Sequence, residues 1–209
     1  LTSILKAYTL DSSEAGNVTG MMTRAVIEGK LEFANLAGSI GRVAPVAAVM
    51  KVSISELLGM LTMITRTGLS ADEAATALRA ALMNLEKPAK QTVKEMEAVG
   101  LSVDGVHASI RDRGLLFTLQ TMYERVGGNA EQMARLLPNV RGLVGVLSML
   151  SSQGADAART ISAISNGLLD GEKSFSKTSE TLQFKMQQIV ALAQVLAIKF
   201  GSEFGPAVK

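Results

Sequence analysis

The single histidine offers the clearest opportunity for catalysis in this sequence. His107 lies between Asp104 and Ser109, and a carboxylate, an imidazole and a hydroxyl are the three groups of a Ser-His-Asp triad. Hydrolases that use such a serine often carry it in a G-x-S-x-G turn, and Ser109 is not part of that motif. We therefore interpret His107 as a loop histidine without a catalytic role.

Composition excludes several other kinds of site. The chain has no Cys and one His, which excludes disulfide scaffolds, thiol nucleophiles, cysteine zinc sites and any site that needs two histidines. Lys and Arg number 21 against 19 Asp and Glu, a net charge of +2, so the balance does not indicate a nucleic-acid-binding surface. The segment Arg111-Asp112-Arg113 is interpreted as a solvated loop. We expect no catalytic residue, no metal site and no cofactor.

The chain is apolar for its size. It has 209 residues, of which 47% are hydrophobic and 19% charged, and its mean hydropathy is +0.26. That length suits one domain, or two small ones, with a buried core. The most apolar windows, Val140–Leu150 and Ile189–Phe200, are shorter than the ~18 to 20 residues that a membrane-spanning helix needs. The excess of apolar residues therefore predicts helices buried against other helices.

The elements that must position these residues are predicted to be helical. Apolar residues recur at helical spacing, and the alternation typical of strands is almost absent. The expected fold class is all-α: an array of short helices and α-hairpins with one longer C-terminal helix. The first helix is expected from residues 11–12 to just before Gly29, and a second from Leu31 that Pro45 interrupts before residues 46–50.

Two serine-led motifs mark further helix starts. Ser53 with Glu56, and Ser70 with Glu73, match the capping box. In this motif the Ser hydroxyl accepts a hydrogen bond from one free backbone N–H, and the Glu side chain accepts a hydrogen bond from another. Gly68, between them, suits a left-handed C-terminal cap. The sequence therefore predicts two helices joined by a short turn.

A separate prediction concerns the methionines that lie off the apolar stripe of the first of these two helices. Core filling explains most of the eleven Met residues, whereas Met60 and Met63 lie outside the stripe and are candidates for contacts at the surface. Residues 101–106 look extended, so a loop or at most a tiny β-hairpin is expected there. Asn129 should cap a short helix that stops before Pro138.

The C-terminal part is expected to carry the longest helix. Residues 178–200 are apolar on more than one face, and one partner cannot cover such a helix. We expect three regions: N-terminal helices over residues 1–50, a helical core over 51–171 and the long C-terminal helix over 172–209. The chain starts at Leu1 without a leader, which suggests a fragment of a much longer protein. The residues expected to make contacts with partners lie on this helix and on the stripe before it: Leu78, Leu82, Ile189, Leu192, Leu196, Ile198 and Phe200.

Several short motifs, in this order, resemble the helical core segment of phage tail tape measure proteins. Together they cover most of the chain, although each one alone is a common helix-capping sequence. The matching stretches are Ala37–Pro45, Val52–Leu57, Thr67–Ala74, Thr76–Arg79, Leu85–Pro88, Val99–Leu101, Asp104–Gly105 and Phe200–Pro206.

The resemblance implies a structural role. Members of this family are long helical proteins that fill the tail tube, template the polymerisation of the tube protein, set tail length and leave the tail when the genome is delivered. The implied partners are the tail tube protein, tail assembly chaperones, distal tail proteins and further copies of the chain as a trimer or hexamer, with possible host membrane contact at infection and no specific nucleic acid binding. The implied location is the tail lumen of the virion, with host cytoplasm during assembly and the host envelope on ejection.

Two other functions stay open at this stage. Ile189–Phe200 and the high mean hydropathy also suit a membrane-active or pore-forming helical protein. A fragment of a peptidoglycan hydrolase comes third: the family's metallopeptidase and papain-like domains need paired His or Cys, which are absent, whereas a lytic transglycosylase needs only a positioned Glu. No motif of that kind is present.

Overall fold

The computed structural model describes residues 1–29, 31–138, 147, 150 and 154–166. Within those residues the regular structure is helical and no strand occurs, so the all-α fold class is confirmed. The helices in chain order are α1 (Thr2–Ala7), the short 3-10 helix η1 (Ser12–Glu14), α2 (Ala15–Gly29), α3 (Phe33–Ile40), α4 (Ala44–Val49), α5 (Ile54–Arg66), α6 (Ala71–Glu86), α7 (Lys90–Ala98), α8 (Val103–Arg113), α9 (Leu115–Arg125), α10 (Ala130–Leu136) and α12 (Gly154–Asn166).

Helix α5 is the centre of the fold. It contacts α2, α6, α9 and α12, and every residue from Glu56 to Thr65 is buried. A helix enclosed on all sides needs apolar residues all round. Met60 and Met63, expected at the surface, are therefore core residues with at most 1% of their surface exposed. The expectation for them was wrong because other helices cover the faces beside the main stripe.

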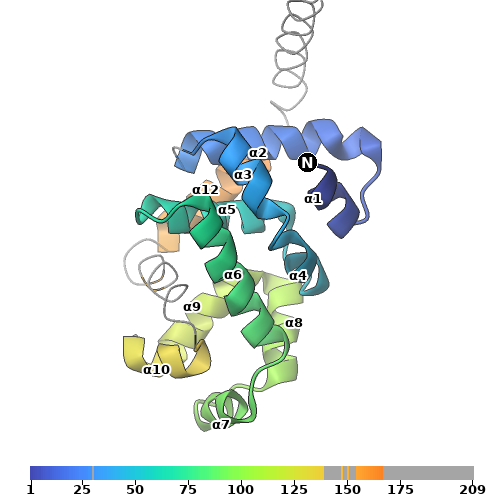
Figure 1. Cartoon of the computed structure of the whole chain (residues 1–209). Coiled ribbons are helices and arrows are strands. Elements are labelled where there is room, and N and C mark those ends of the chain that lie inside the picture. The colour runs from blue at the N-terminus through green and yellow to red at the C-terminus, as the bar shows by residue number, and fades with distance from the viewer. Residues whose placement is uncertain (30, 139–146, 148–149, 151–153, 167–209) are drawn as a thin grey trace, which may run out of the picture.

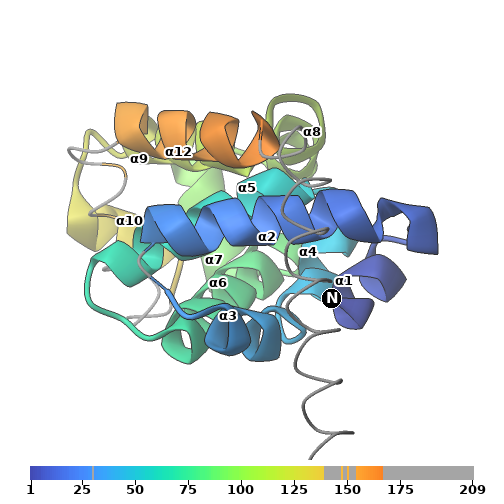
Figure 2. The same cartoon turned by 90° about the horizontal axis from the view of Figure 1, so that it is seen from above.

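Helices α2 and α12 cover one side of α5. Figure 2 shows them side by side, with α5 next to both. The contact between α5 and α12 is close because Gly59 has no side chain: a Cβ there would overlap Cγ1 of Ile161 and lie 3.3 Å from its Cα. A glycine in mid-helix here allows two helix backbones to approach each other.

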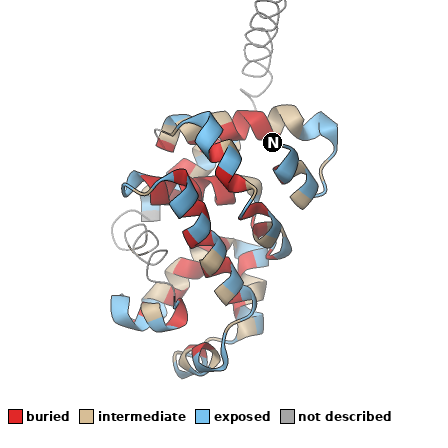
Figure 3. Ribbon diagram, in the orientation of Figure 1, coloured by how far each residue is buried: buried red, intermediate tan, exposed pale blue. Residues whose placement is uncertain are grey.

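The other helices pack around α6, which is the longest helix described. Helix α6 contacts α3, α4, α5 and α8, α8 packs on α9, and α10 packs on α7 (Figure 1). Figure 3 shows buried positions along the inward faces of these helices and exposed positions on their outer faces. One hydrophobic core runs through the whole described part, from Ile4 to Ile164.

Most predicted helix ends are confirmed. Ser70 and Glu73 form a complete capping box, Gly68 has a left-handed φ of 97°, and the Asn129 side chain accepts hydrogen bonds from two backbone N–H groups at the start of α10. The helix predicted from Leu31 is interrupted before Pro45, which lies in the first turn of α4. These signals are readable because each acts within one turn of its helix.

Residues 101–106 are the main local correction. Ser102 caps α8 by accepting a hydrogen bond of 3.1 Å from the backbone N–H of Gly105, so Asp104 and Gly105 lie in the first helical turn. Asp104 and Gly105 therefore belong to the start of a helix, where an acidic residue is favourable. No hairpin forms there. Helix α1 was not anticipated, and the long helix expected over 178–200 lies outside the described residues.

Candidate interaction surface

The predicted contact residues do not share one surface in the folded chain. Leu78 and Leu82 lie on the inner face of α6 and are exposed by 1% and 0% of their surface. They pack against the other helices of the same core. Ile189, Leu192, Leu196, Ile198 and Phe200 lie outside the described residues, so for them the expectation stays a prediction. A partner surface in the described part must therefore use other side chains.

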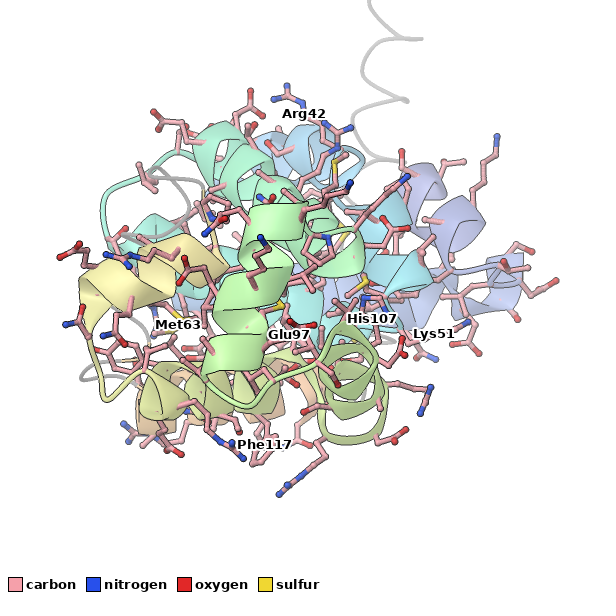
Figure 4. All side chains as sticks on the ribbon, turned by 90° about the horizontal axis from the view of Figure 1, so that it is seen from below. Arg42, Lys51, Met63, Glu97, His107 and Phe117 are labelled. Atoms are coloured by element: carbon pink, nitrogen blue, oxygen red, sulfur yellow. The ribbon has the colours of Figure 1, made fainter. Side chains whose placement is uncertain are left out.

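His107 has a structural partner. It lies on α8 rather than in a loop, and its Nε2 is 2.8 Å from the backbone oxygen of Leu85 near the end of α6 (Figure 4). Ser109, the hydroxyl of the hypothetical triad, bonds to the hydroxyl of Thr118 at 2.7 Å. The imidazole thus satisfies a carbonyl at a helix end, where the last carbonyls lack partners within the helix.

The buried carboxylate of Glu56, for which the sequence predicted only a local capping role, links α5 to α9. The Ser53 hydroxyl accepts from the Glu56 N–H, as a capping serine does. The Glu56 carboxylate, however, accepts a hydrogen bond of 2.8 Å from the N–H of Leu116 at the start of α9. Burial, with the negative charge of Glu56 as the smaller cause, raises the pKa of Tyr8 well above its usual value. The capping box predicted at Ser53 and Glu56 is only half formed, because the Glu56 carboxylate bonds to α9 instead of to the backbone N–H of Ser53.

Arg66 holds three helices together. Its guanidinium donates to the backbone oxygen of Glu28 at 2.9 Å and pairs with the Glu28 carboxylate at 3.1 Å, both on α2. The same guanidinium pairs with Asp156 on α12 at 2.9 Å. The side chain is 28% exposed, so this is a structural clamp at the edge of the core. Sequence reasoning missed it because the partners lie 38 and 90 residues away.

A groove of about 490 Å³ lies between the outer faces of α4 and α6. We call it the α4–α6 groove, and its lining residues are Arg42, Pro45, Val46, Val49, Thr76, Arg79, Met83 and Glu86. Val49 and Met83, which are exposed by 63% and 47% of their surface, give this groove apolar side chains that are open to solvent. Arg42, at the edge of the molecule in Figure 4, pairs with Asp72 at 3.1 Å.

The described residues combine packing surfaces with few reactive groups. No group of three His, Cys, Asp or Glu side chains in the described part could hold a metal ion. None of the helices described is both long and apolar enough to span a bilayer. The apolar segment 189–200, on which the membrane-active alternative rested, lies outside the described residues. The arrangement of the described side chains is suited to protein contacts through an apolar groove flanked by charges.

Comparison with known proteins supports the family resemblance. A family model described as phage-related minor tail protein matches residues 1–142. The chain is 27% identical over 213 residues to the protein named "Tape measure protein" of Pneumococcus phage Dp-1, across 100% of this chain and 18% of that protein. It therefore spans about a fifth of the length of this curated relative. No solved structure matches the chain.

Proposed function

The chain belongs to the phage-related minor tail protein family, and from that premise we propose that it is a structural segment of a tape measure protein that acts by packing and not by catalysis. As a tail component it belongs to the virion. The observation that carries the proposal is the match to a tape measure protein along the entire chain. A share of 18% of that relative's length suits a segment that works within a longer polypeptide.

The described side chains support a packing role. The candidate histidine, the buried glutamate and the arginine at the edge of the core each bond within the chain: His107 to Leu85, Glu56 to Leu116 and Arg66 to Glu28. Polar groups used in this way stabilise the arrangement of helices, since a buried group without a partner is costly. Exposed apolar residues on outer helix faces then serve contacts with other molecules.

We assign the finer roles by the same reasoning. The segment contributes to tail length as part of the ruler, contacts the tail tube protein and assembly chaperones during assembly in the host cytoplasm, and lies in the tail lumen of the finished virion. The segment then leaves the tail with the genome and reaches the host envelope.

Deletion in the phage tests the ruler role. Residues 1–166 are removed in frame, or duplicated in a second strain, and tail lengths are measured by electron microscopy. Deletion should shorten the tail and duplication should lengthen it. A change of about 250 Å corresponds to 166 residues as one extended helix at about 1.5 Å per residue, whereas about 40 Å corresponds to a compact domain of that size. Tails of unchanged length in both strains would contradict the proposal.

The absence of a reaction is tested separately. The purified chain is run on a gel that contains peptidoglycan, beside hen lysozyme as the positive control. We expect no clearing band at the position of the chain. A clearing band that survives further purification would show an enzymatic activity and overturn that part of the proposal.

A further inference from the structure

A second groove, of about 320 Å³, lies between α8 and α9, and we call it the α8–α9 groove. The two helices follow one another through Gly114 and pack together (Figure 1). The start of α8 and the end of α9 line one end of the groove, and Arg113 with Phe117 lines the other. Its apolar floor consists of Leu101, Val106, Phe117 and Met122.

Each end of the α8–α9 groove carries a guanidinium. Arg113 lies over the ring of Phe117, 3.5 Å from its centroid, and this contact favours a position of the charge at the ring face. Phe117 is labelled at the edge of the molecule in Figure 4. Arg125 lies at the other end, since a Cβ on Gly100 would be 3.1 Å from its Nη1. Both arginines are exposed, and neither is in an ion pair within the described part of the chain.

The acidic neighbours of these arginines in the sequence do not cancel their charges. Asp112 pairs with Arg111 at 2.8 Å. Glu124 directly precedes Arg125 on α9, and consecutive residues of a helix do not face each other. An occupant of the groove should therefore place a carboxylate at each end.

The hydroxyl groups between the two ends are suited to accept hydrogen bonds. Thr118 donates to the backbone oxygen of Gly114 at 2.7 Å, so Ser109 is the donor in its bond of 2.7 Å to Thr118. Thr121 donates to the backbone oxygen of Phe117 at 3.0 Å. Ser109 and Thr121 line the groove and keep free lone pairs. An extended peptide has backbone N–H groups to donate to them, whereas a helix uses most of its own.

We propose that the α8–α9 groove binds an extended segment of a partner protein in which two acidic residues flank an apolar residue at alternate positions, as in Glu-x-Leu-x-Glu. Alternate residues of an extended chain lie on one side, and the outer two are about 13 Å apart at about 3.3 Å per residue. Helix α9 spans about 12 Å from Phe117 to Arg125 at about 1.5 Å per residue. Both carboxylates therefore reach an arginine while the apolar side chain packs on the floor.

A nucleic acid matches the groove less well. It carries a phosphate on every unit, and these charges would lie against the apolar floor between the arginines. The inference rests on the proposed function, because it gives the chemistry of one partner of a segment that works in an assembly.

Peptide binding tests the pattern. The fluorescein-labelled peptide SETLTES is titrated with the 209-residue chain, and its anisotropy should rise with a dissociation constant below about 1 mM. The peptide SQTLTQS lacks both carboxylates and SETSTES lacks the apolar residue, so each should bind about tenfold more weakly. Arg113→Glu and Arg125→Glu should each weaken binding of SETLTES about tenfold. The double variant R113E/R125E should bind SRTLTRS instead.

Matched controls separate this contact from general charge effects. Arg79→Glu reverses an exposed arginine on α6 and should leave binding of SETLTES unchanged. Thr121→Val keeps the shape of the side chain but removes an acceptor, and it should weaken binding about threefold. Circular dichroism checks that each variant keeps its helix content.

Any of four results would overturn the proposal. They are no binding of SETLTES at up to about 1 mM, equal binding of SQTLTQS, unchanged binding in both arginine variants, and tighter binding of a single-stranded DNA oligonucleotide that displaces SETLTES. None of them bears on the deletion experiment, in which tail length changes or stays constant whether or not this groove is occupied. Failure of the peptide contact and failure of the ruler role are therefore distinguishable.

Discussion

The carboxylate of Glu56 caps the start of α9 by accepting a hydrogen bond of 2.8 Å from the backbone N–H of Leu116, 60 residues away in the chain. Glu56 lies on the central helix α5, so this bond fixes the position of α9 relative to the core. Gly114, at the N-cap position of α9, has a φ of 92°, and a Cβ there would lie 2.8 Å from Glu56 Oε1. The carboxylate and the glycine therefore form one unit.

Replacing Glu56 should destabilise the fold. Glu56→Ala leaves the buried N–H of Leu116 without an acceptor, which costs about 1 to 3 kcal/mol of unfolding free energy. Glu56→Gln retains an acceptor oxygen and should cost less. Urea denaturation gives both values. Glu86→Ala, at an exposed position on α6, is the control and should change stability by less than about 0.5 kcal/mol. Equal effects of Ala and Gln at position 56 would contradict the capping role.

Glycine substitutions should have opposite effects at different sites. Gly114→Ala should lower stability by about 1 to 2 kcal/mol, because it puts a Cβ at positive φ and against Glu56. Gly16 and Gly38 are in helices and a Cβ would meet nothing within 4 Å at either. Alanine there should raise stability by about 0.5 to 1 kcal/mol. Thermal unfolding followed by circular dichroism distinguishes the two classes, and a common sign for all three would be contrary to the structure.

The close approach of α5 and α12 predicts a coupled pair. Gly59→Ala should destabilise the protein by about 1 to 3 kcal/mol, since the new methyl group overlaps Ile161. Ile161→Ala removes the overlapping atom, so the double variant should be more stable than the sum of the single effects predicts. A double-mutant cycle measures this coupling, with about 0.5 kcal/mol or more expected for residues in contact. Simple additivity would show that the two helices do not meet at Gly59.

Two helix ends carry non-glycine residues in the left-handed region. Thr9 has a φ of 54° and Lys51 a φ of 61°. In both cases the next residue closes the helix end, as Leu10 bonds to Leu5 at 2.8 Å and Val52 to Ala47 at 2.9 Å. Glycine is the usual residue at this position. Thr9→Gly and Lys51→Gly should each stabilise the protein by about 0.5 to 1 kcal/mol in urea denaturation, and a loss of stability in both would refute the left-handed assignment.

Asp72 should make stability depend on pH. The Ser39 hydroxyl, which bonds to this carboxylate, and the nearby Arg42 lower the pKa of Asp72 in the folded protein. A carboxyl group with a lowered folded pKa contributes stability above its unfolded value of about 3.9, and this contribution is lost as pH falls through the folded pKa. The stability difference between wild type and Asp72→Asn should therefore shrink below about pH 4.

Urea midpoints measured from pH 7 to pH 2 check this dependence. Ser39→Ala removes the main cause of the lowered pKa, so the pH-dependent difference should be smaller in that background. A difference between wild type and Asp72→Asn that is constant over the whole pH range would show that the Asp72 carboxylate has no preferred partner in the folded state.

Local signals account for the part of the fold that was predictable. The all-α class, the helix start at Ser70, the left-handed Gly68 and the Asn129 cap were all readable, because each depends on residues within one helical turn. The family resemblance was readable for the same reason, since ordered cap motifs carry it. Residues 101–106 were misjudged because Asp-Gly suits both a tight turn and the first turn of a helix.

The candidate site was much less predictable. Leu78 and Leu82 were expected to contact partners, and they lie in the core; Val49, Met83 and Phe33, which are exposed, were not singled out. An apolar stripe shows that a helix face is buried but not what buries it, because the hydrophobic effect has no direction. Exposure of a single Val or Met depends on whether another helix covers it.

The sequence by itself determined that this protein is helical, where many of its helices begin and end, and that it lacks the cysteines and paired histidines of common catalytic sites. The tertiary structure alone decided that Met60 and Met63 face the core, that Glu56 caps a helix 60 residues away, and that Arg66 joins α2 to α12. The physical reason is distance along the chain. Caps and helical periodicity act over a few residues, whereas burial and long-range bonds exist only after loop closure has brought separate helices together.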